Sequence, residues 1–250
     1  MHQPDMVTCT PITIPMKDKT MEKNQLFSLM QFAGGTFPTG AFSQSWGLET
    51  TVSDGRITTL DDFQKYLEAH IRGVLTTLEG PALCHAYELA KSGGLADNQE
   101  LIELEDQVTA MRLTRENREA SHRTGKALIR IASGMLDRKD LTGYYLNREE
   151  AGINYPVAFG LLAALLDVPK EEALSAFFFS AVNAMVQSAV KLIPLGNGEA
   201  QKLIFENYYL VGSVVETAMA IPMEEMYSFC PAFDLASIRH ETLPTRLYMS

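Results

Sequence analysis

The chain has 250 residues, of which 46% are hydrophobic, and a formal net charge of -10 at pH 7. This length and apolar content suffice to bury a sizeable core, as one domain or as two closely fused halves. The excess of acidic residues argues against nucleic acid and anionic membrane surfaces as partners. Cys9, Cys84 and Cys230 lie far apart without a CxxC pair, which favours a reducing compartment over a disulfide framework or a structural zinc site. No apolar secretion signal precedes the first motifs, so we expect a cytoplasmic protein.

The first half of the chain reads as a tail followed by helices. Residues 1–25 contain three prolines and no helical period, which predicts a mobile tail. Thr59 and Asp62 have the spacing of a capping box, and apolar residues then recur at three- and four-residue steps as far as Leu78. We expect Gly80-Pro81 to break this helix and a second helix to cover 82–91. Residues 98–135 are helical again, in two pieces or in one bent piece.

The second half contains a long apolar helix. Asn154 and Pro156 suit the cap and first turn of a helix through PVAFGLLAALLD. The next helix covers 168–193, and its uncharged stretch 173–190 is long enough to span a bilayer. Its serines, Asn183 and Gln187 make it too polar for insertion, so we predict a core helix and no membrane. A further helix is expected over 199–220, with a mostly irregular segment after Pro222.

No alternating strand pattern and no fixed repeat appears, so the predicted fold class is all-α. We expect a single-domain helical bundle around the long apolar central helix, covering residues 26–236. The mobile N-terminal tail 1–25 precedes it, and an extended, partner-binding C-terminal tail covers 237–250.

The sequence offers little catalytic chemistry. The loop around Gly34, Gly35 and Gly40 lacks the P-loop and dinucleotide-binding patterns, and no serine lies in a G-x-S-x-G elbow. Cys84, His85 and Glu88 are close enough in sequence to offer metal ligands or a small-molecule site. A lone histidine at the end of an apolar helix face is more often structural, so we predict no metal site and no catalytic residues.

Two segments stand out by charge. MRLTRENREASHRTGKALIR (111–130) carries a basic stripe of Arg112, Arg115, Arg118, Arg123, Lys126 and Arg130. Four-residue spacings to Glu116 and Glu119 favour a self-paired, solvated helix face, and a docking surface for an acidic partner is the alternative. The C-terminal IRHETLPTRLYMS (238–250) combines arginine, tyrosine and leucine, which are typical interface anchors. A tail packed on its own domain is the alternative.

Several motifs in order carry a family resemblance: FPTGAFSQSWGLET (37–50), TRENRE (114–119), PVAFG (156–160), VKLIPLG (190–196) and RHETLPTRLYMS (239–250). From about Leu26 to Ser250 the chain resembles the urease accessory protein F family. The resemblance implies an all-helical cytoplasmic homodimer without catalysis of its own. Such proteins bind a second accessory protein, D or H, and together recruit the GTPase accessory protein G to deliver nickel to urease apoprotein. No cofactor is expected to bind tightly, because the complex handles nickel and the partner binds GTP.

The resemblance also assigns partner-binding roles by motif. Arg246 matches the arginine of the R-L-[FY]-x-S ending, the part that orders in the family when the platform forms. Some members have tyrosine where this chain has Phe42, so only a stacking role carries over. Lys191 also suits the C-terminal end of a helix dipole, so a structural role is equally open. The predicted set is Pro38, Gly40, Phe42, Gln44, Glu49, Lys191, His240, Glu241, Arg246, Leu247 and Tyr248.

The loop 37–50 is therefore interpreted as partner-facing. For its single tryptophan, Trp46, a place in the core is favoured over a contact with the partner. Two other functions stay open. The chain could activate the partner GTPase directly through Arg246 or an arginine of the basic stripe. Less favoured is a helical enzyme built around Cys84, His85 and Glu88.

Overall fold

The computed structural model describes residues 21–95 and 98–249. Helices and the loops between them make up this part of the chain, and no strand occurs in it. The all-α prediction is therefore confirmed. The α-helices are α1 (Lys23–Phe32), α2 (Leu48–Ser53), α3 (Leu60–His70), α4 (Gly80–Ser92), α5 (Gln99–Met111), α6 (Arg115–Leu136), α7 (Lys139–Arg148), α8 (Tyr155–Leu165), α9 (Lys170–Leu192), α10 (Asn197–Glu206), α11 (Tyr208–Ala220) and α12 (Pro231–His240).

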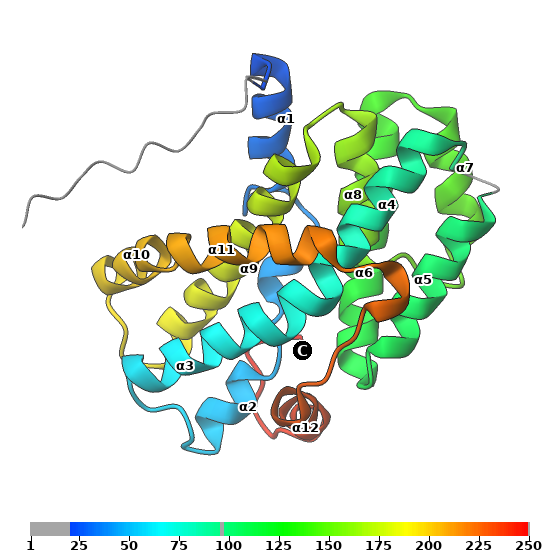
Figure 1. The fold of residues 1–250 in the computed structure, drawn as a ribbon. Coiled ribbons are helices and arrows are strands. Elements are labelled where there is room, and N and C mark those ends of the chain that lie inside the picture. The colour runs from blue at the N-terminus through cyan, green and yellow to red at the C-terminus, as the bar shows by residue number, and fades with distance from the viewer. Residues whose placement is uncertain (1–20, 96–97, 250) are drawn as a thin grey trace, which may run out of the picture.

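The long apolar helix α9 forms the axis of the fold, as its sequence predicts. It contacts α8, α10 and α11, and Figure 1 shows α10 and α11 on one side of it and the group α4 to α8 on the other. By length and composition α9 could cross a membrane, but most of its apolar stretch is buried inside the protein. Such burial is typical of the core helix of a soluble protein.

A close helix pair, α4 and α8, supports this axis. Gly160, within the PVAFG motif, lies so near α4 that an added Cβ would stand 2.2 Å from the carbonyl oxygen of Leu83. Only glycine permits this approach, which brings the backbones of the two helices together. The motif is thus explained by packing.

The predicted helix break at Gly80-Pro81 is wrong. A π-helical segment, Ile71–Glu79, joins α3 to α4, so the chain stays helical from Leu60 to Ser92. Pro81 lies in the first turn of α4, but because the helix continues from Ile71–Glu79, its missing N–H removes one internal hydrogen bond. The carbonyl of Thr77, four residues earlier, would lack a partner in an α-helix, and it accepts a hydrogen bond from the Tyr227 N–H at 3.1 Å. A contact distant in sequence therefore compensates for the proline.

Other boundaries differ from the predictions in specific ways. Residues 1–20 of the predicted tail lie outside the described residues, but α1 already begins at Lys23, inside the predicted range 1–25. The expected helix 199–220 is two helices, because the chain turns at Asn207, whose buried amide donates to the Leu203 carbonyl at 2.8 Å. The segment after Pro222 is less irregular than expected, since α12 spans the predicted boundary between 236 and 237.

Two predicted helix starts are confirmed, but only at the first does the predicted side chain cap the helix. Thr59 and Asp62 form the capping box of α3. Asn154 does precede α8, but its side chain makes no capping bond. Its amide instead donates to buried Glu105 at 2.8 Å and accepts from Arg112 at 3.3 Å. It also accepts from the Ser121 hydroxyl on α6 at 3.2 Å, so Asn154 links α5 and α6 to the start of α8.

Candidate functional site

The C-terminal residues fold back onto the FPTGAFSQSWGLET segment. The carboxylate of Glu49, in the first turn of α2, accepts hydrogen bonds from the backbone N–H groups of Leu247 at 2.7 Å and Tyr248 at 3.1 Å. The Met249 N–H donates to the carbonyl of Ser43 at 2.9 Å. Three consecutive N–H groups at the end of the chain therefore have partners in this one segment. Two distant motifs of the sequence meet here.

A histidine between two carboxylates connects this contact to α6. His240, the last residue of α12, is fully buried, with Nε2 3.0 Å from Glu49 and Nδ1 2.8 Å from Glu116. The Arg246 guanidinium donates to the other oxygen of Glu116 at 2.9 Å. Each ring nitrogen of His240 therefore faces a carboxylate oxygen that can accept a hydrogen bond.

Tyr248 is the main apolar anchor of the tail. It is buried, its hydroxyl lies 3.5 Å from the Ser188 carbonyl on α9, and the Lys191 ammonium stands 5.6 Å from the centre of its ring. That distance suits a cation–π interaction. Lys191 is also in the last turn of α9, where it favours the helix dipole. Glu49, Glu116, Lys191, His240, Arg246 and Tyr248 are called the tail-docking site below.

Gly47 makes the tail-docking site possible. It has a φ of +83° and an added Cβ would lie 3.0 Å from the Cβ of Ala236 on α12. Glycine at this position therefore supplies both the left-handed backbone and the space for α12. The preceding Trp46 also has a positive φ, and its carbonyl accepts from the Tyr66 hydroxyl at 2.8 Å. These contacts fix the start of α2 and aim Glu49 at the tail.

The other predicted partner-binding residues are divided between surface and interior. Gln44 is buried, Phe42 is half-buried against Gly35, and Trp46 is partly buried on the core. Three others are exposed, and Glu241 is half-exposed with a salt bridge to Arg115 at 2.8 Å. The exposed ones are Pro38, Gly40 and Leu247.

The basic stripe on α6 is mostly not paired within its own helix. The four-residue spacings predict the pairs Arg112–Glu116, Arg115–Glu119 and Glu119–Arg123. Of these, the structure forms only Arg115–Glu119, at 4.0 Å. Arg112 is buried and binds Glu79 at 2.6 Å, and Glu116 is used by the tail-docking site. The prediction of a self-paired solvated face is therefore wrong for Arg112, which precedes α6, and for Glu116, because long-range partners bury both side chains. Arg115 remains 64% exposed and keeps its predicted partner.

The group Cys84, His85 and Glu88 is not assembled. Cys84 is buried, which raises the pKa of its thiol to about 12. His85 lies 3.0 Å from the Ile221 carbonyl, and Glu88 pairs with Lys170 at 2.5 Å. Within residues 21–95 and 98–249 no three histidine, cysteine or acidic side chains come together as metal ligands. The geometry gives no support to an enzyme at this place.

Comparison with known proteins agrees with the motifs that meet at the tail-docking site. A family model described as UreF matches residues 57–208. The chain belongs to the UreF family. It is similar to the urease accessory protein UreF of Bacillus sp. (strain TB-90), at 32% identity over 91% of this chain and 100% of the relative. The UreF of Lachnoclostridium phytofermentans is 32% identical over 91% of this chain and 99% of the relative. That of Paenarthrobacter aurescens is 30% identical over 92% of this chain and 100% of the relative.

The family resemblance seen in the sequence is therefore confirmed, and the chain is a urease accessory protein rather than an enzyme. Sequence reasoning missed Glu116 as a member of the tail-docking site. The signal was present, because Glu116 belongs to the TRENRE motif and lies in the first turn of α6. It was interpreted only as a helix-surface partner of Arg112.

Proposed function

We propose that the chain is a cytoplasmic, non-catalytic scaffold for urease maturation. In this proposal it binds accessory protein D or H, and the pair recruits the GTPase accessory protein G to urease apoprotein for nickel insertion. Nickel is the cargo of the assembly and GTP is bound by the GTPase. The observation that supports the proposal is the docked C-terminal tail, which is held by buried ionic contacts and presents other side chains outward.

Apolar side chains surround the docked tail at the surface. Leu247 is 73% exposed although Glu49 holds its backbone, and Leu235 and Ile238 on α12 are 61% and 52% exposed. Phe229, just before α12, is 75% exposed. Large exposed apolar groups beside an arginine resemble the composition of a protein interface. We infer that this surface binds accessory protein D or H.

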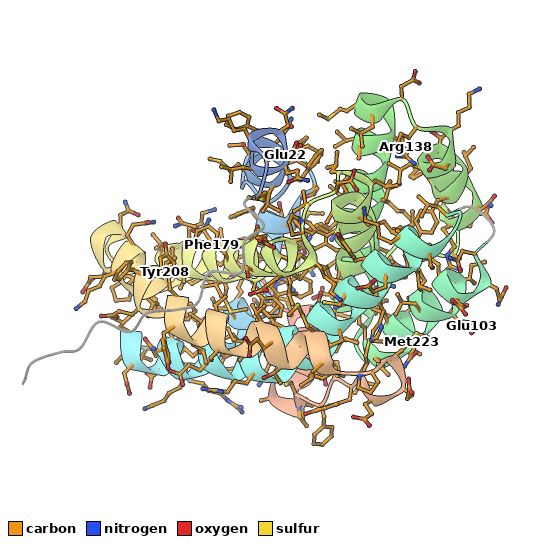
Figure 2. All side chains as sticks on the ribbon, turned by 45° about the horizontal axis from the view of Figure 1, so that its top comes forward. Glu22, Glu103, Arg138, Phe179, Tyr208 and Met223 are labelled. Atoms are coloured by element: carbon orange, nitrogen blue, oxygen red, sulfur yellow. The ribbon has the colours of Figure 1, made fainter. Side chains whose placement is uncertain are left out.

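A second exposed apolar surface supports the homodimer. Phe179 on α9 lies 6.1 Å from Tyr208, ring centre to ring centre (Figure 2). The ring of Phe205 lies 5.2 Å from that of Tyr208. Tyr209 beside them is 89% exposed. Clustered exposed aromatic rings are unusual on a monomer and favour an interface. This aromatic patch of Phe179, Phe205, Tyr208 and Tyr209 is our proposed dimer contact.

Light scattering after gel filtration tests the scaffold. We would compare the full chain with a version ending at Glu241, each mixed with the companion accessory protein and the GTPase. Ending at Glu241 keeps α12 and the buried His240 and removes only the residues of the docked tail. Assembly of the full chain alone is expected. Equal assembly of both versions would show that the tail is incidental, and no assembly by either would contradict the scaffold.

A further inference from the structure

The second half of the basic stripe lines an open hollow on α6, C-terminal to Glu116 of the tail-docking site. Residues 119, 122, 123, 126, 127 and 130 share one face of α6, and Tyr145 of α7 closes the opposite side. The hollow has a volume of about 490 Å³. Three of its residues are cations, namely Arg123, Lys126 and Arg130. We call this feature the basic hollow.

The cations of the basic hollow differ from the rest of the stripe. Arg112 and Arg115 form ion pairs, and Arg118 donates to the carbonyls of Arg112 and Leu113. Among the described residues, no acidic group forms an ion pair with Arg123, Lys126 or Arg130. Their charges thus remain available in a chain whose net charge is -10.

The remaining polar groups around the basic hollow are already engaged. Glu119 on the rim pairs with Arg115, and the Tyr145 hydroxyl donates to Glu149 at 2.9 Å. His122 contacts the Thr109 hydroxyl at 3.0 Å, and burial, together with nearby cations, lowers its pKa to about 4. The ring is therefore neutral at pH 7. The positive charge of the basic hollow comes from its three long side chains.

The arrangement fits a protein segment better than a small molecule. The three cations are three and four residues apart, so they span roughly 10 Å along α6 at about 1.5 Å per residue. Carboxylates spaced by three or four residues on a facing helix have the same separation. Small-molecule sites, by contrast, are mainly apolar and enclose their ligand. Here the two arginines are exposed to solvent and the hollow is open.

We propose that the basic hollow docks an acidic segment of a protein partner in the urease maturation assembly. This inference rests on the proposed scaffold function and adds a contact separate from the tail-docking site. Attraction between the row of cations and the acidic segment selects the partner and speeds its association, against the repulsion that the chain's net negative charge causes elsewhere.

Charge reversal in the basic hollow tests this contact. The variant R123E/K126E/R130E would be compared with R56E/R72E/K139E, which makes the same change in net charge at three exposed cations outside the basic hollow. Accessory protein D or H would be titrated against the chain alone, and the GTPase and urease apoprotein would each be titrated against the chain already bound to accessory protein D or H. We expect the first variant to weaken one of these Kd values at least tenfold and the control less than twofold. The variant R123Q/K126Q/R130Q removes the three charges without reversing them. It therefore tests the same contact with less risk of unfolding the chain.

The outcomes separate the two proposals. Lack of any assembly by the unmodified chain would contradict the scaffold function itself. If the unmodified chain assembles and the basic-hollow variants bind every partner as tightly, the basic hollow is not a docking site. If the control variant weakens binding as much as R123E/K126E/R130E does, the effect comes from net charge alone, and the proposal is also overturned. So would tight binding of inorganic phosphate by the three cations with no change in any protein Kd, since the ligand would then be a small anion. The proposal would be supported if high salt weakens the binding of the unmodified chain but not that of the basic-hollow variants.

Discussion

Glu49 and His240 lie 3.0 Å apart in the interior although 191 residues separate them in sequence. Glu49 also holds the backbone of the last residues, so one side chain connects α2, α12 and the C-terminal tail. Removing a carboxylate from such a contact leaves buried donors without acceptors, which costs more than the net value of the bonds.

We therefore predict that Glu49→Ala lowers the free energy of unfolding by about 3 kcal/mol. It should also loosen residues 247 and 248, because their N–H groups lose the carboxylate that accepts from both. Guanidinium titration measures the first effect and hydrogen exchange of the tail amides the second. Glu49→Gln keeps the shape and one acceptor oxygen, so its loss should be smaller. Unchanged exchange in Glu49→Ala would show that Tyr248 alone fixes the tail.

Arg246 allows docking to be separated from stability. Its side chain is 41% exposed, so its pair with Glu116 contributes under about 1 kcal/mol to folding. We expect Arg246→Ala to leave the melting temperature almost unchanged but to weaken binding of accessory protein D or H at least tenfold. Calorimetric titration measures this, with Arg115→Ala as the control, since Arg115 is also exposed and paired. Equal affinities for both variants would remove Arg246 from the interface.

The same variant tests the alternative of direct GTPase activation. In the docked tail the Arg246 guanidinium is on Glu116, so it would have to leave this partner to reach a nucleotide. If the assembled complex hydrolyses GTP at the same rate with Arg246→Ala, Arg246 is not a finger arginine, whose loss costs roughly 10³-fold or more. A loss of that size would favour the alternative.

Much of the fold follows from local sequence, whereas the site does not. Capping at Thr59 and the apolar length of α9 are local signals, and both were predicted correctly. The continuous helix through Pro81 depends on Tyr227, which lies 146 residues away, and no local rule reveals it. Glu116 is similar, because its nearest basic residues in sequence suggested a surface pair while its real partners come from the C-terminus. Burial and charge pairing across the chain decide such contacts.

A buried acid gives a prediction for pH. Burial raises the pKa of Glu105 to about 7 from 4.5, although Tyr144 and Asn154 donate hydrogen bonds to it. The folded chain therefore keeps a proton that the unfolded chain releases between pH 4.5 and 7. Stability from this group is present below pH 4.5 and decreases as the pH rises through the window, by at most about 3 kcal/mol.

Glu105→Gln should remove this dependence. We expect the difference in unfolding free energy between the unmodified chain and Glu105→Gln to fall as the pH rises from 5 to 7.5, measured by guanidinium titration at each pH. The comparison cancels the pH dependence that other groups contribute to stability. One of these groups is His70: burial lowers its pKa to about 4, so its contribution to stability increases as the pH rises. A constant difference would show that Glu105 stays ionised in the folded chain throughout.

The aromatic patch gives a prediction for the oligomer. Tyr209 is 89% and Phe205 69% exposed, so replacing them removes little packing within one chain. If they form the dimer contact, F205S/Y209S should weaken dimerisation at least tenfold, because central aromatic anchors carry much of the binding energy of an interface. Sedimentation velocity over a concentration series measures this. Phe229→Ser, at 75% exposure near the tail, is the control and should leave the dimer intact. A dimer that survives F205S/Y209S but separates with Phe229→Ser would move the dimer contact to the surface around α12.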